Sequence, residues 1–294
     1  MQLVIQGLTK TYDNGVQALK GIDLEIPQGM FGLLGPNGAG KSTLMRTIAT
    51  LQEADAGTIR LDDIDVLKEK EKVRKVLGYL PQEFGVYPKV EADRLLDHIA
   101  VLKGITNKTD RSNVVESLLK RTNLWHVRNK SLGTFSGGMK QRFGIAQALI
   151  GDPHLVIVDE PTAGLDPAER NRFLNLLSEL GEHTIVILST HIVEDVKELC
   201  TAMAIINQGA VLFKGNPSTA VDEVSGKIWK KKIRKNELED YRKNFNVLSE
   251  QLIAGSPEIR VLEHSRPEGF ERAEADLEDV YFSQLAEERT QSST

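Results

Sequence analysis

The stretch at residues 32–43, "GLLGPNGAGKST", decides the fold class of this chain of 294 residues. Residues 35–42 fit the spacing G-x-x-x-x-G-K-[ST], between an apolar run at 30–34 and a helical pattern from residue 41. A strand, a glycine-rich turn and a helix in this order form a phosphate-binding loop, or P-loop, because glycine permits positive φ and lets backbone N–H groups curl around a phosphate. The sequence therefore predicts an α/β protein that binds a polyphosphate.

The residues of this loop are expected to contact a bound phosphate chain. Lys41 would contact the β- and γ-phosphate oxygens, Ser42 would hold Mg²⁺, and Thr43 would lie near the α-phosphate. A glycine-rich turn that only joins strand to helix is the alternative, and it does not explain why Gly, Lys and Ser all stand at the required spacing. The expected binding residues are Gly35, Pro36, Asn37, Gly38, Ala39, Gly40, Lys41, Ser42 and Thr43.

A second apolar run, "LVIVDE" at 155–160, ends in two carboxylates. A strand that ends in Asp159 places this carboxylate where it can hold a Mg²⁺ water. Glu160 comes next and therefore points in another direction, which suits a general base for an attacking water. The alternative is a cluster that caps a following helix, since Pro161 and Thr162 come next.

A further glycine-rich turn, "SGGMKQR" at 136–142, precedes a helical pattern. Backbone N–H groups at a helix start are unpaired and the helix dipole is positive there, so this turn also suits an anion. The chain thus carries two phosphate-binding devices that lie far apart in the sequence. A serine N-cap followed by flexible glycines is the structural alternative.

Short apolar runs alternate with amphipathic helical patterns through the middle of the chain. This alternation is typical of a mostly parallel sheet with helices on both faces. Antiparallel hairpins are expected on either side of it, one turning at Asn14 and Gly15 and the other at Gln208 and Gly209. We expect strands at 30–34, 75–80, 155–160 and 184–190, and helices at 41–51, 91–104, 111–125, 136–150, 167–181 and 192–200.

The pattern changes after about residue 216, so we predict a nucleotide-binding unit at 1–219 and a small α+β unit at 220–294. In the second unit, residues 246–264 indicate two strands and residues 268–288 indicate a helix. The basic run "KIWKKKIRK" at 227–235 is interpreted as a solvated strand edge, with contact to anionic lipid as the alternative. An accessory or regulatory role is expected for this unit, which ends in a polar tail.

Composition narrows the class of protein. The 37 basic and 42 acidic residues leave a formal net charge of −5, which argues against a chain that binds nucleic acid along its whole length. The single cysteine, Cys200, cannot form an internal disulfide, suits a reducing cytosol and is expected to be a small buried side chain. We find neither a signal-peptide pattern nor an apolar run that could span a bilayer, so any membrane role is expected to come through a partner.

Taken together, these motifs resemble those of the ATP-binding-cassette (ABC) ATPases over residues 1 to about 215. They follow the family order: the P-loop at 35–43, Gln82 after a strand, the signature "SGGMK" at 136–140, "LVIVDEP" at 155–161, "GLDP" at 164–167 and a histidine, His191, closing a strand. The resemblance implies a P-loop cassette with a mostly parallel core, an antiparallel β subdomain and a helical subdomain. It also implies hydrolysis of ATP with Mg²⁺.

The same resemblance gives the signature a role in a dimer. In this family two cassettes pair head to tail, so Ser136, Gly137 and Gly138 of one copy would bind the γ-phosphate held by the other. Asp166 would lie in the loop that crosses the dimer seam. Phe135 and Met139 depart from the leucine and glutamine that are common in the family, but the three phosphate-contacting residues remain.

Further roles carry over from the family motifs. Tyr12 matches the aromatic residue that stacks on adenine, with simple packing as the alternative. Gln82 matches the glutamine that touches Mg²⁺ or the attacking water, and His191 matches the histidine that binds the γ-phosphate. The metal site would then comprise Ser42, Gln82 and Asp159, and catalysis would rest on Glu160, His191 and Gln82.

Within the family, the segments at 79–100 and 135–167 and the C-terminal "ADLEDVYFSQL" look like the bacterial exporters of drugs, antibiotics and bacteriocins. The resemblance therefore implies a homodimeric subunit on the cytoplasmic face of the cell membrane, bound to a separate permease and not to nucleic acid. The alternative is a soluble ABC ATPase that drives a non-transport assembly or repair machine. The segment "PKVEADRLL" departs from the sequence usual in exporters and neighbours the surface expected to receive the membrane subunit, which favours a different partner.

Overall fold

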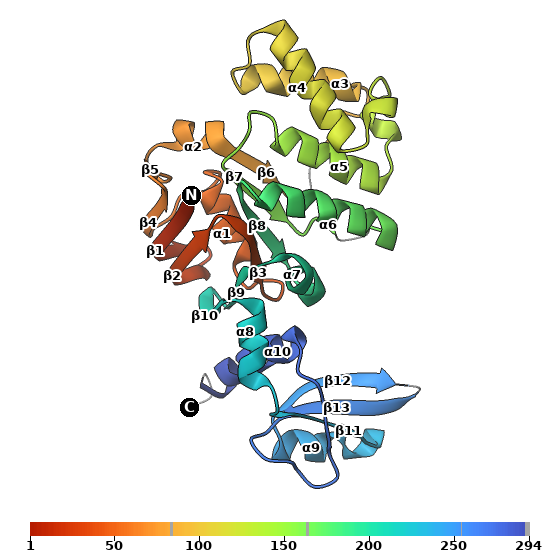
Figure 1. The fold of residues 1–294 in the computed structure, drawn as a ribbon. Coiled ribbons are helices and arrows are strands. Elements are labelled where there is room, and N and C mark those ends of the chain that lie inside the picture. Colours follow the sequence, from red (N-terminus) through yellow and green to blue (C-terminus); the bar gives the residue numbers. More distant parts are fainter. Residues whose placement is uncertain (83–84, 163–164, 254, 292–294) are drawn as a thin grey trace.

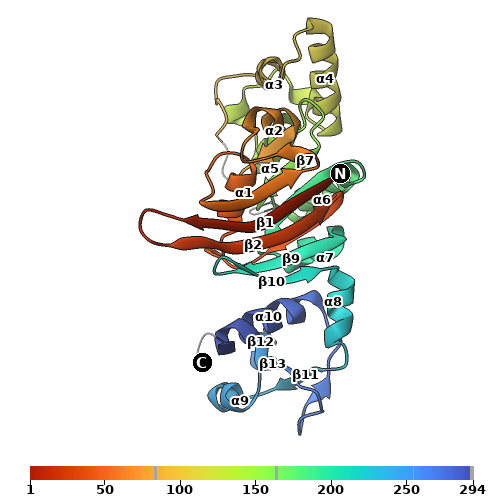
Figure 2. The same cartoon turned by 90° about the vertical axis from the view of Figure 1, so that its left-hand side faces the viewer.

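The computed structural model describes residues 1–82, 85–162, 165–253 and 255–291 (Figure 1). Three sheets organise this part of the chain: a six-stranded central sheet, a four-stranded N-terminal sheet and a four-stranded C-terminal sheet. The first two share one α/β body, and the third lies at one end of the molecule (Figures 1 and 2). The expected α/β fold with an antiparallel β subdomain, a helical subdomain and a C-terminal α+β unit is therefore confirmed.

The central sheet has the order β10-β9-β3-β8-β7-β6. Its strands are β3 (Gly29–Leu34), β6 (Leu77–Leu80), β7 (Leu155–Asp159), β8 (Ile185–Thr190), β9 (Ala202–Asn207) and β10 (Ala210–Gly215). All neighbours pair in parallel except β9 and β10, which form the predicted hairpin. Every residue of β7 and β8 is buried, as expected for strands covered on both faces. The carboxyl ends of the parallel strands therefore meet at one edge, where the candidate site lies.

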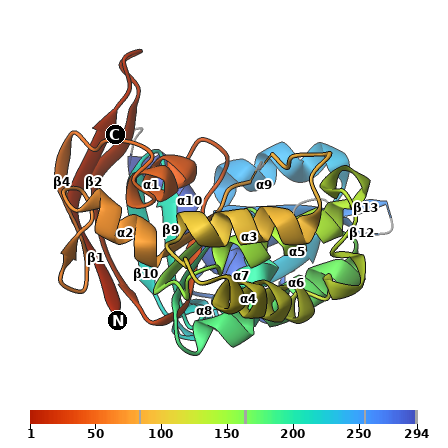
Figure 3. The same ribbon diagram turned by 90° about the horizontal axis from the view of Figure 1, so that it is seen from above.

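The N-terminal sheet covers one face of the central sheet. It comprises β1 (Gln2–Thr11), β2 (Gln17–Pro27), β4 (Ala56–Leu61) and β5 (Ile64–Asp65), and helices α1 (Lys41–Ile48) and α2 (Lys70–Val76) accompany it. Leu44, Met45 and Ile48 of α1 are fully buried in a core shared by both sheets. Seen from above, the long β1–β2 hairpin projects from the body beside α1 (Figure 3).

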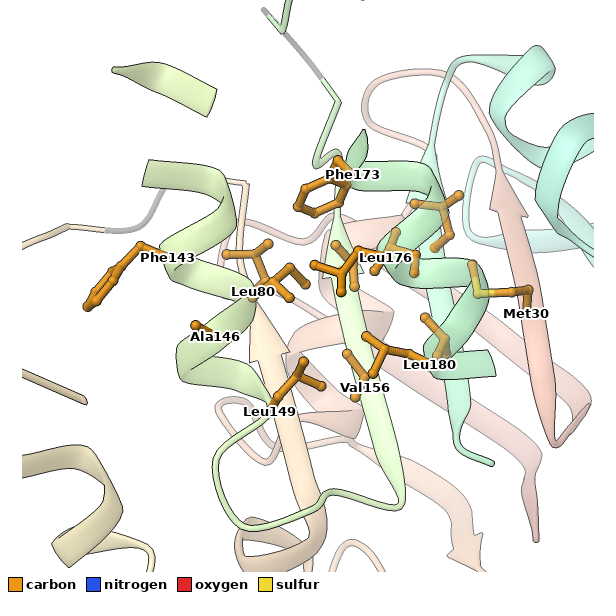
Figure 4. Close-up of a cluster of buried hydrophobic side chains, with 14 of the residues drawn as sticks. Met30, Leu80, Phe143, Ala146, Leu149, Val156, Phe173, Leu176 and Leu180 are labelled. Carbon is orange, nitrogen blue, oxygen red and sulfur yellow. The ribbon is translucent and has the colours of Figure 1, made fainter. Parts of the chain in front are cut away.

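The other face of the central sheet is covered by helices α5 (Gly137–Ala148), α6 (Pro167–Gly181) and α7 (Val193–Leu199). Helices α3 (Ala92–Leu102) and α4 (Lys108–Arg121) pack on α5, farther from the sheet, with two short 3-10 turns at Trp125–Val127 and Leu132–Thr134. Leu149, next to α5, and Leu176 and Leu180 of α6 point toward Val156 of the sheet (Figure 4). The largest hydrophobic core thus lies between these helices and the sheet.

The C-terminal part contains α8 (Pro217–Val224), β11 (Ile228–Lys232), α9 (Leu238–Asn244), β12 (Val247–Ile253), β13 (Ser256–Leu262), β14 (Glu271–Arg272) and α10 (Leu277–Gln291). Helix α10 packs on α8 and also contacts α7, β9 and β10. Leu277, Val280 and Tyr281 of α10 are buried in the same core as α5 and α6. The division expected after residue 219 falls within α8, and the core extends across it.

The sequence-based elements differ from the structure in several places. Residues 268–276, expected to be helical, form no helix, because Phe270 is fully buried against the C-terminal sheet and β14 pairs with β11. Helix α10 starts only at Leu277, where Asp276 and Asp279 each accept a hydrogen bond from the other's backbone N–H (3.1 and 3.0 Å). Residues 75 and 76, expected to begin a strand, end helix α2. Helix α8 was not predicted, although Asn216 before Pro217 is a typical helix start.

Across the described residues, no helix combines the length and the apolar character needed to cross a membrane.

Candidate functional site

An open cavity of about 570 Å³ lies at the carboxyl edge of the central sheet, above the start of α1. The strand β3 leads into the P-loop and the loop leads into α1, as the sequence predicted. Residues from five separate segments surround the cavity, because the topology brings β2 and the β9–β10 turn beside the P-loop. The lining residues are Tyr12, Val16, Gln17, Ala18, Lys20, Pro36, Asn37, Gly38, Ala39, Gly40, Lys41, Ser42, Thr43, Gln82, Glu160, Gln208 and Gly209.

Two glycines give the P-loop its shape. Gly38 and Gly40 have φ angles of 80° and 106°, in the left-handed region that other residues rarely adopt. A Cβ at Gly40 would also lie 2.6 Å from the carbonyl oxygen of Ala18. The loop therefore depends on glycine at this position for both its backbone angle and its close packing against β2.

Lys41 is the buried cation of the cavity. Its side chain is only 5% exposed, and Nζ donates hydrogen bonds to the carbonyl oxygens of Gly35 (2.6 Å) and Pro36 (3.2 Å). Burial lowers the pKa of Lys41, and the charges of Glu160 and Asp159 oppose this effect. An anion in the cavity would stabilise the charged ammonium further, so the site fits a phosphate.

Glu160 lies at the centre of a polar cluster. Its Oε2 accepts a hydrogen bond from Gln82 Nε2 at 3.2 Å, and its Oε1 lies 3.2 Å from His191 Nδ1 and 3.8 Å from Lys41 Nζ. The side chain is 10% exposed. The structure therefore brings together the three residues, Glu160, Gln82 and His191, that the sequence assigned to catalysis.

The backbone at Glu160 has an unusual conformation. Its φ of 47° lies in the left-handed region, and its N–H donates to the carbonyl oxygen of Ser189 on β8 at 2.8 Å. Strained backbone of this kind is concentrated at functional sites, where the surrounding structure holds it in place. The turn directs Glu160 away from Asp159, the last residue of β7.

Asp159 fits a metal-binding role. It is 4% exposed, and its Oδ1 has no hydrogen-bond partner among the described residues. A buried carboxylate oxygen without a protein partner is rare and indicates a bound water or cation. Ser42, by contrast, is exposed to the cavity. The oxygen donors of Ser42, Asp159 and the amide of Gln82 suit Mg²⁺, which prefers oxygen ligands.

Tyr12 lies at the outer wall of the cavity. It is 40% exposed, and its hydroxyl shares a hydrogen bond with Thr43 Oγ1 (3.0 Å) and donates to Gln52 Oε1 (3.2 Å). The ring is thus held beside the P-loop, in a position compatible with stacking on a base. Gln52 was not singled out from the sequence because its partner lies 40 residues away.

The signature residues and Asp166 lie elsewhere. Ser136 caps α5 and accepts a hydrogen bond from Met139 N at 3.2 Å, and Asp166 caps α6 and accepts one from Glu169 N at 2.9 Å. None of Ser136, Gly137, Gly138 and Asp166 is among the described residues that line the cavity of their own chain. The "GLDP" motif begins at Gly164, which lies outside the described residues.

Comparison with known proteins identifies the family. The family model for ABC transporters matches residues 19–163. The ABC transporter ATP-binding protein NatA of Bacillus subtilis is 37% identical over 203 residues, which cover 68% of this chain and 82% of that protein. This chain belongs to the ABC transporter family.

Other members have names that refer to resistance. The linearmycin resistance ATP-binding protein LnrL of Bacillus subtilis is 37% identical over 71% of this cassette chain and 67% of its own length. The daunorubicin/doxorubicin resistance ATP-binding protein DrrA of Streptomyces peucetius is 37% identical over 71% of this chain and 63% of its own length. The predicted resemblance to ABC proteins of this kind is confirmed.

Solved structures of ABC cassettes share the fold. The ATP-binding cassette MJ0796, solved as a dimer in a post-hydrolysis state with ADP and phosphate, has a TM-score of 0.67 and 26% identity. The match covers 73% of this chain and 98% of the MJ0796 chain. The likeness confirms the ABC cassette architecture of the central and N-terminal sheets with their helices.

The structure adds the start of β2 and the β9–β10 turn to the ABC site, and the motifs assigned neither. The β9–β10 turn at Gln208 and Gly209 lines the cavity, and Gly209 N donates to the carbonyl oxygen of Ala39 in the P-loop at 2.9 Å. The sequence indicated the turn but not its neighbour, because the contact depends on β9 pairing with β3.

Proposed function

We propose that this cassette binds ATP with Mg²⁺ in the P-loop cavity and hydrolyses it, with Glu160 as the general base. The observation that carries the proposal is the position of the Glu160 carboxylate, within 3.2 Å of Gln82 and His191 and 3.8 Å from the P-loop lysine. A carboxylate beside a glutamine, a histidine and a phosphate-binding lysine has the partners that an oriented attacking water requires.

Each residue has a defined task in this reaction. Glu160 takes a proton from the water that attacks the γ-phosphorus, Gln82 and His191 orient that water and the γ-phosphate, and Lys41 stabilises the charge on the phosphate oxygens. The bond to the β–γ bridging oxygen breaks, and ADP and phosphate leave. When bound, Mg²⁺ supplies further charge neutralisation at the phosphates, and Ser42, Asp159 and Gln82 are the residues that would hold it or its waters.

The second part of the proposal is a head-to-tail homodimer. Ser136, Gly137 and Gly138 expose backbone N–H groups at the start of α5, but they do not line the cavity of their own chain as far as the structure describes it. Their chemistry suits a γ-phosphate held by a second copy. The dimeric state of the MJ0796 cassette supports this arrangement, in which Asp166 would lie at the seam.

The third part concerns the work that ATP drives. We propose that two copies bind a separate membrane permease on its cytoplasmic side and power export, with residues 220–294 as an accessory or regulatory unit. The names of DrrA and LnrL, which refer to antibiotic resistance, support export. No nucleic-acid partner is proposed, because the net charge is −5.

Two measurements test this function. The purified chain should release phosphate from Mg-ATP, and Lys41→Ala should abolish release, because the variant lacks the cation that contacts the phosphates. A wild-type chain that binds ATP without releasing phosphate would contradict hydrolysis. Co-expressed with its permease, the chain should sediment with membranes and leave them with that permease in detergent. Persistent failure to associate with any integral membrane protein would favour a non-transport machine instead.

A further inference from the structure

A fully buried carboxylate lies behind the ABC site, outside the cavity. Asp195 of α7 is 0% exposed. Its Oδ2 accepts a hydrogen bond from Thr162 Oγ1 at 2.7 Å, and its Oδ1 accepts one from Arg170 Nε at 2.8 Å and lies 2.6 Å from Arg170 Nη2. Thr162 is itself only 4% exposed. Asp195 thus has partners on two other segments of the chain.

Each member of this trio follows a residue with a proposed role in hydrolysis or dimer contact. Thr162 comes two residues after Glu160, Arg170 comes four residues after Asp166, and Asp195 comes four residues after His191. The backbone shortens these links, since Arg170 N donates to the carbonyl oxygen of Asp166 at 2.9 Å. One carboxylate at the start of α7, the helix after β8, therefore connects the loop between β7 and α6 with the first turn of α6.

The energetics favour a geometric role for the trio. Desolvation of a carboxylate is costly, and the attraction of a buried ion pair only roughly repays that cost, so the pair contributes little net stability. Its hydrogen bonds do fix a geometry, because the planar guanidinium of Arg170 and the hydroxyl of Thr162 each approach a different carboxylate oxygen. Glu160, with its φ of 47°, needs neighbours that hold its strained backbone in place.

We infer that Asp195 is a positioning residue for hydrolysis, holding Glu160 in register with His191 through Thr162 and Arg170. The inference rests on the proposed ATPase function and adds a group that never touches the nucleotide. Removal of the Thr162 hydroxyl should leave the P-loop intact and let Glu160 shift. A displacement of about 1 Å in a catalytic group lowers turnover by up to about 100-fold.

The test uses the full chain and the variant Thr162→Val, which keeps the side-chain shape and removes the hydroxyl. We expect kcat for Mg-ATP hydrolysis to fall by about 10- to 100-fold, with the Kd for ATP unchanged. Thr162→Ser should restore kcat, because serine can donate the same hydrogen bond. Asp195→Asn should lower kcat in the same way. If Asp195→Asn fails to fold, Thr162→Val alone still tests the inference.

A matched control separates positioning from stability. Thr122 is 2% exposed, and its hydroxyl donates to the carbonyl oxygen of Leu118 at 2.8 Å in the helical subdomain, far from the site in the chain. Thr122→Val likewise removes a buried hydroxyl that donates a hydrogen bond, and it should do so without a loss of kcat. Wild-type kcat in Thr162→Val, or equal losses in both variants, would overturn the positioning role. Absence of hydrolysis by the wild-type chain would instead contradict the proposed function, and the inference with it.

Discussion

The substitution Glu160→Gln separates catalysis from binding in this cassette. Glutamine has the same size as glutamate but is not basic at neutral pH. A positioned general base contributes about 10²- to 10⁴-fold, which corresponds to about 3–5 kcal/mol of activation free energy. The effect of Glu160→Gln on the free energy of ATP binding should be much smaller. The new amide accepts a hydrogen bond at its oxygen and donates from its nitrogen, so at most one of the contacts with Gln82 and His191 is lost, at about 0.5–1.5 kcal/mol.

Phosphate release at saturating Mg-ATP measures the first effect, and the Kd for ATP measures the second. We expect turnover to fall at least about 100-fold while ATP still binds. Glu179→Gln is the matched control, because Glu179 is 65% exposed and its only ion pair among the described residues is with Arg121, at 3.8 Å. The control should hydrolyse ATP at the wild-type rate. Turnover near the wild-type rate in Glu160→Gln would refute the assignment of the base.

Three further predictions concern the fold around the site. Burial raises the pKa of the Cys200 thiol from 9.0 to about 12, so at pH 8 a thiol reagent should label it only in denaturant. The stability contributed by the buried thiol should be lost as the pH rises from 9.0 toward 12. Rapid labelling of the native chain would contradict this burial. Gly40→Ala should lower the free energy of unfolding by about 1–3 kcal/mol, because Gly40 has a φ of 106°, and it should abolish ATP binding. Calorimetry measures the affinity for ATP, and an unchanged affinity would contradict the role of this glycine. Truncation after residue 219 removes Leu277, Val280 and Tyr281 and exposes the core that they cover. The free energy of unfolding should fall by more than about 5 kcal/mol, and the Tm should fall with it. A fragment with the Tm of the full chain would contradict the shared core.

Local signals in the sequence predicted much of the ABC fold and site. The P-loop spacing placed β3, α1 and Lys41, and the apolar run before Asp159 placed β7. Helix α6 begins and ends at the predicted residues, because Asp166 and Pro167 form a strong start signal and the apolar positions recur at helical spacing. These features depend on a few consecutive residues, so the sequence alone determines them.

Features that depend on tertiary packing were not predictable in this way. Phe270 lies in a stretch with helical character, yet its burial against the C-terminal sheet keeps residues 268–276 out of the helix. Helix α10 returns to the cassette core over a distance of many residues, which a boundary drawn from composition at residue 219 does not show. The link between Thr162, Arg170 and Asp195 has the same origin, since the β7–α6 loop, α6 and α7 meet only after the sheet has formed.

The signature residues of one copy are proposed to contact the γ-phosphate of the other, so the dimer should form only when that phosphate is present. Size-exclusion chromatography with light scattering compares the dimer fraction of Glu160→Gln at saturating ATP and at saturating ADP. We predict dimers with ATP and monomers with ADP, because only ATP offers the γ-phosphate to Ser136, Gly137 and Gly138 of the second copy, and charge-assisted contacts are strong. Adding Ser136→Arg should abolish the ATP-dependent dimer while ATP still binds the chain's own P-loop. Equal dimer fractions with both nucleotides, or normal dimers in the Ser136→Arg variant, would contradict the account.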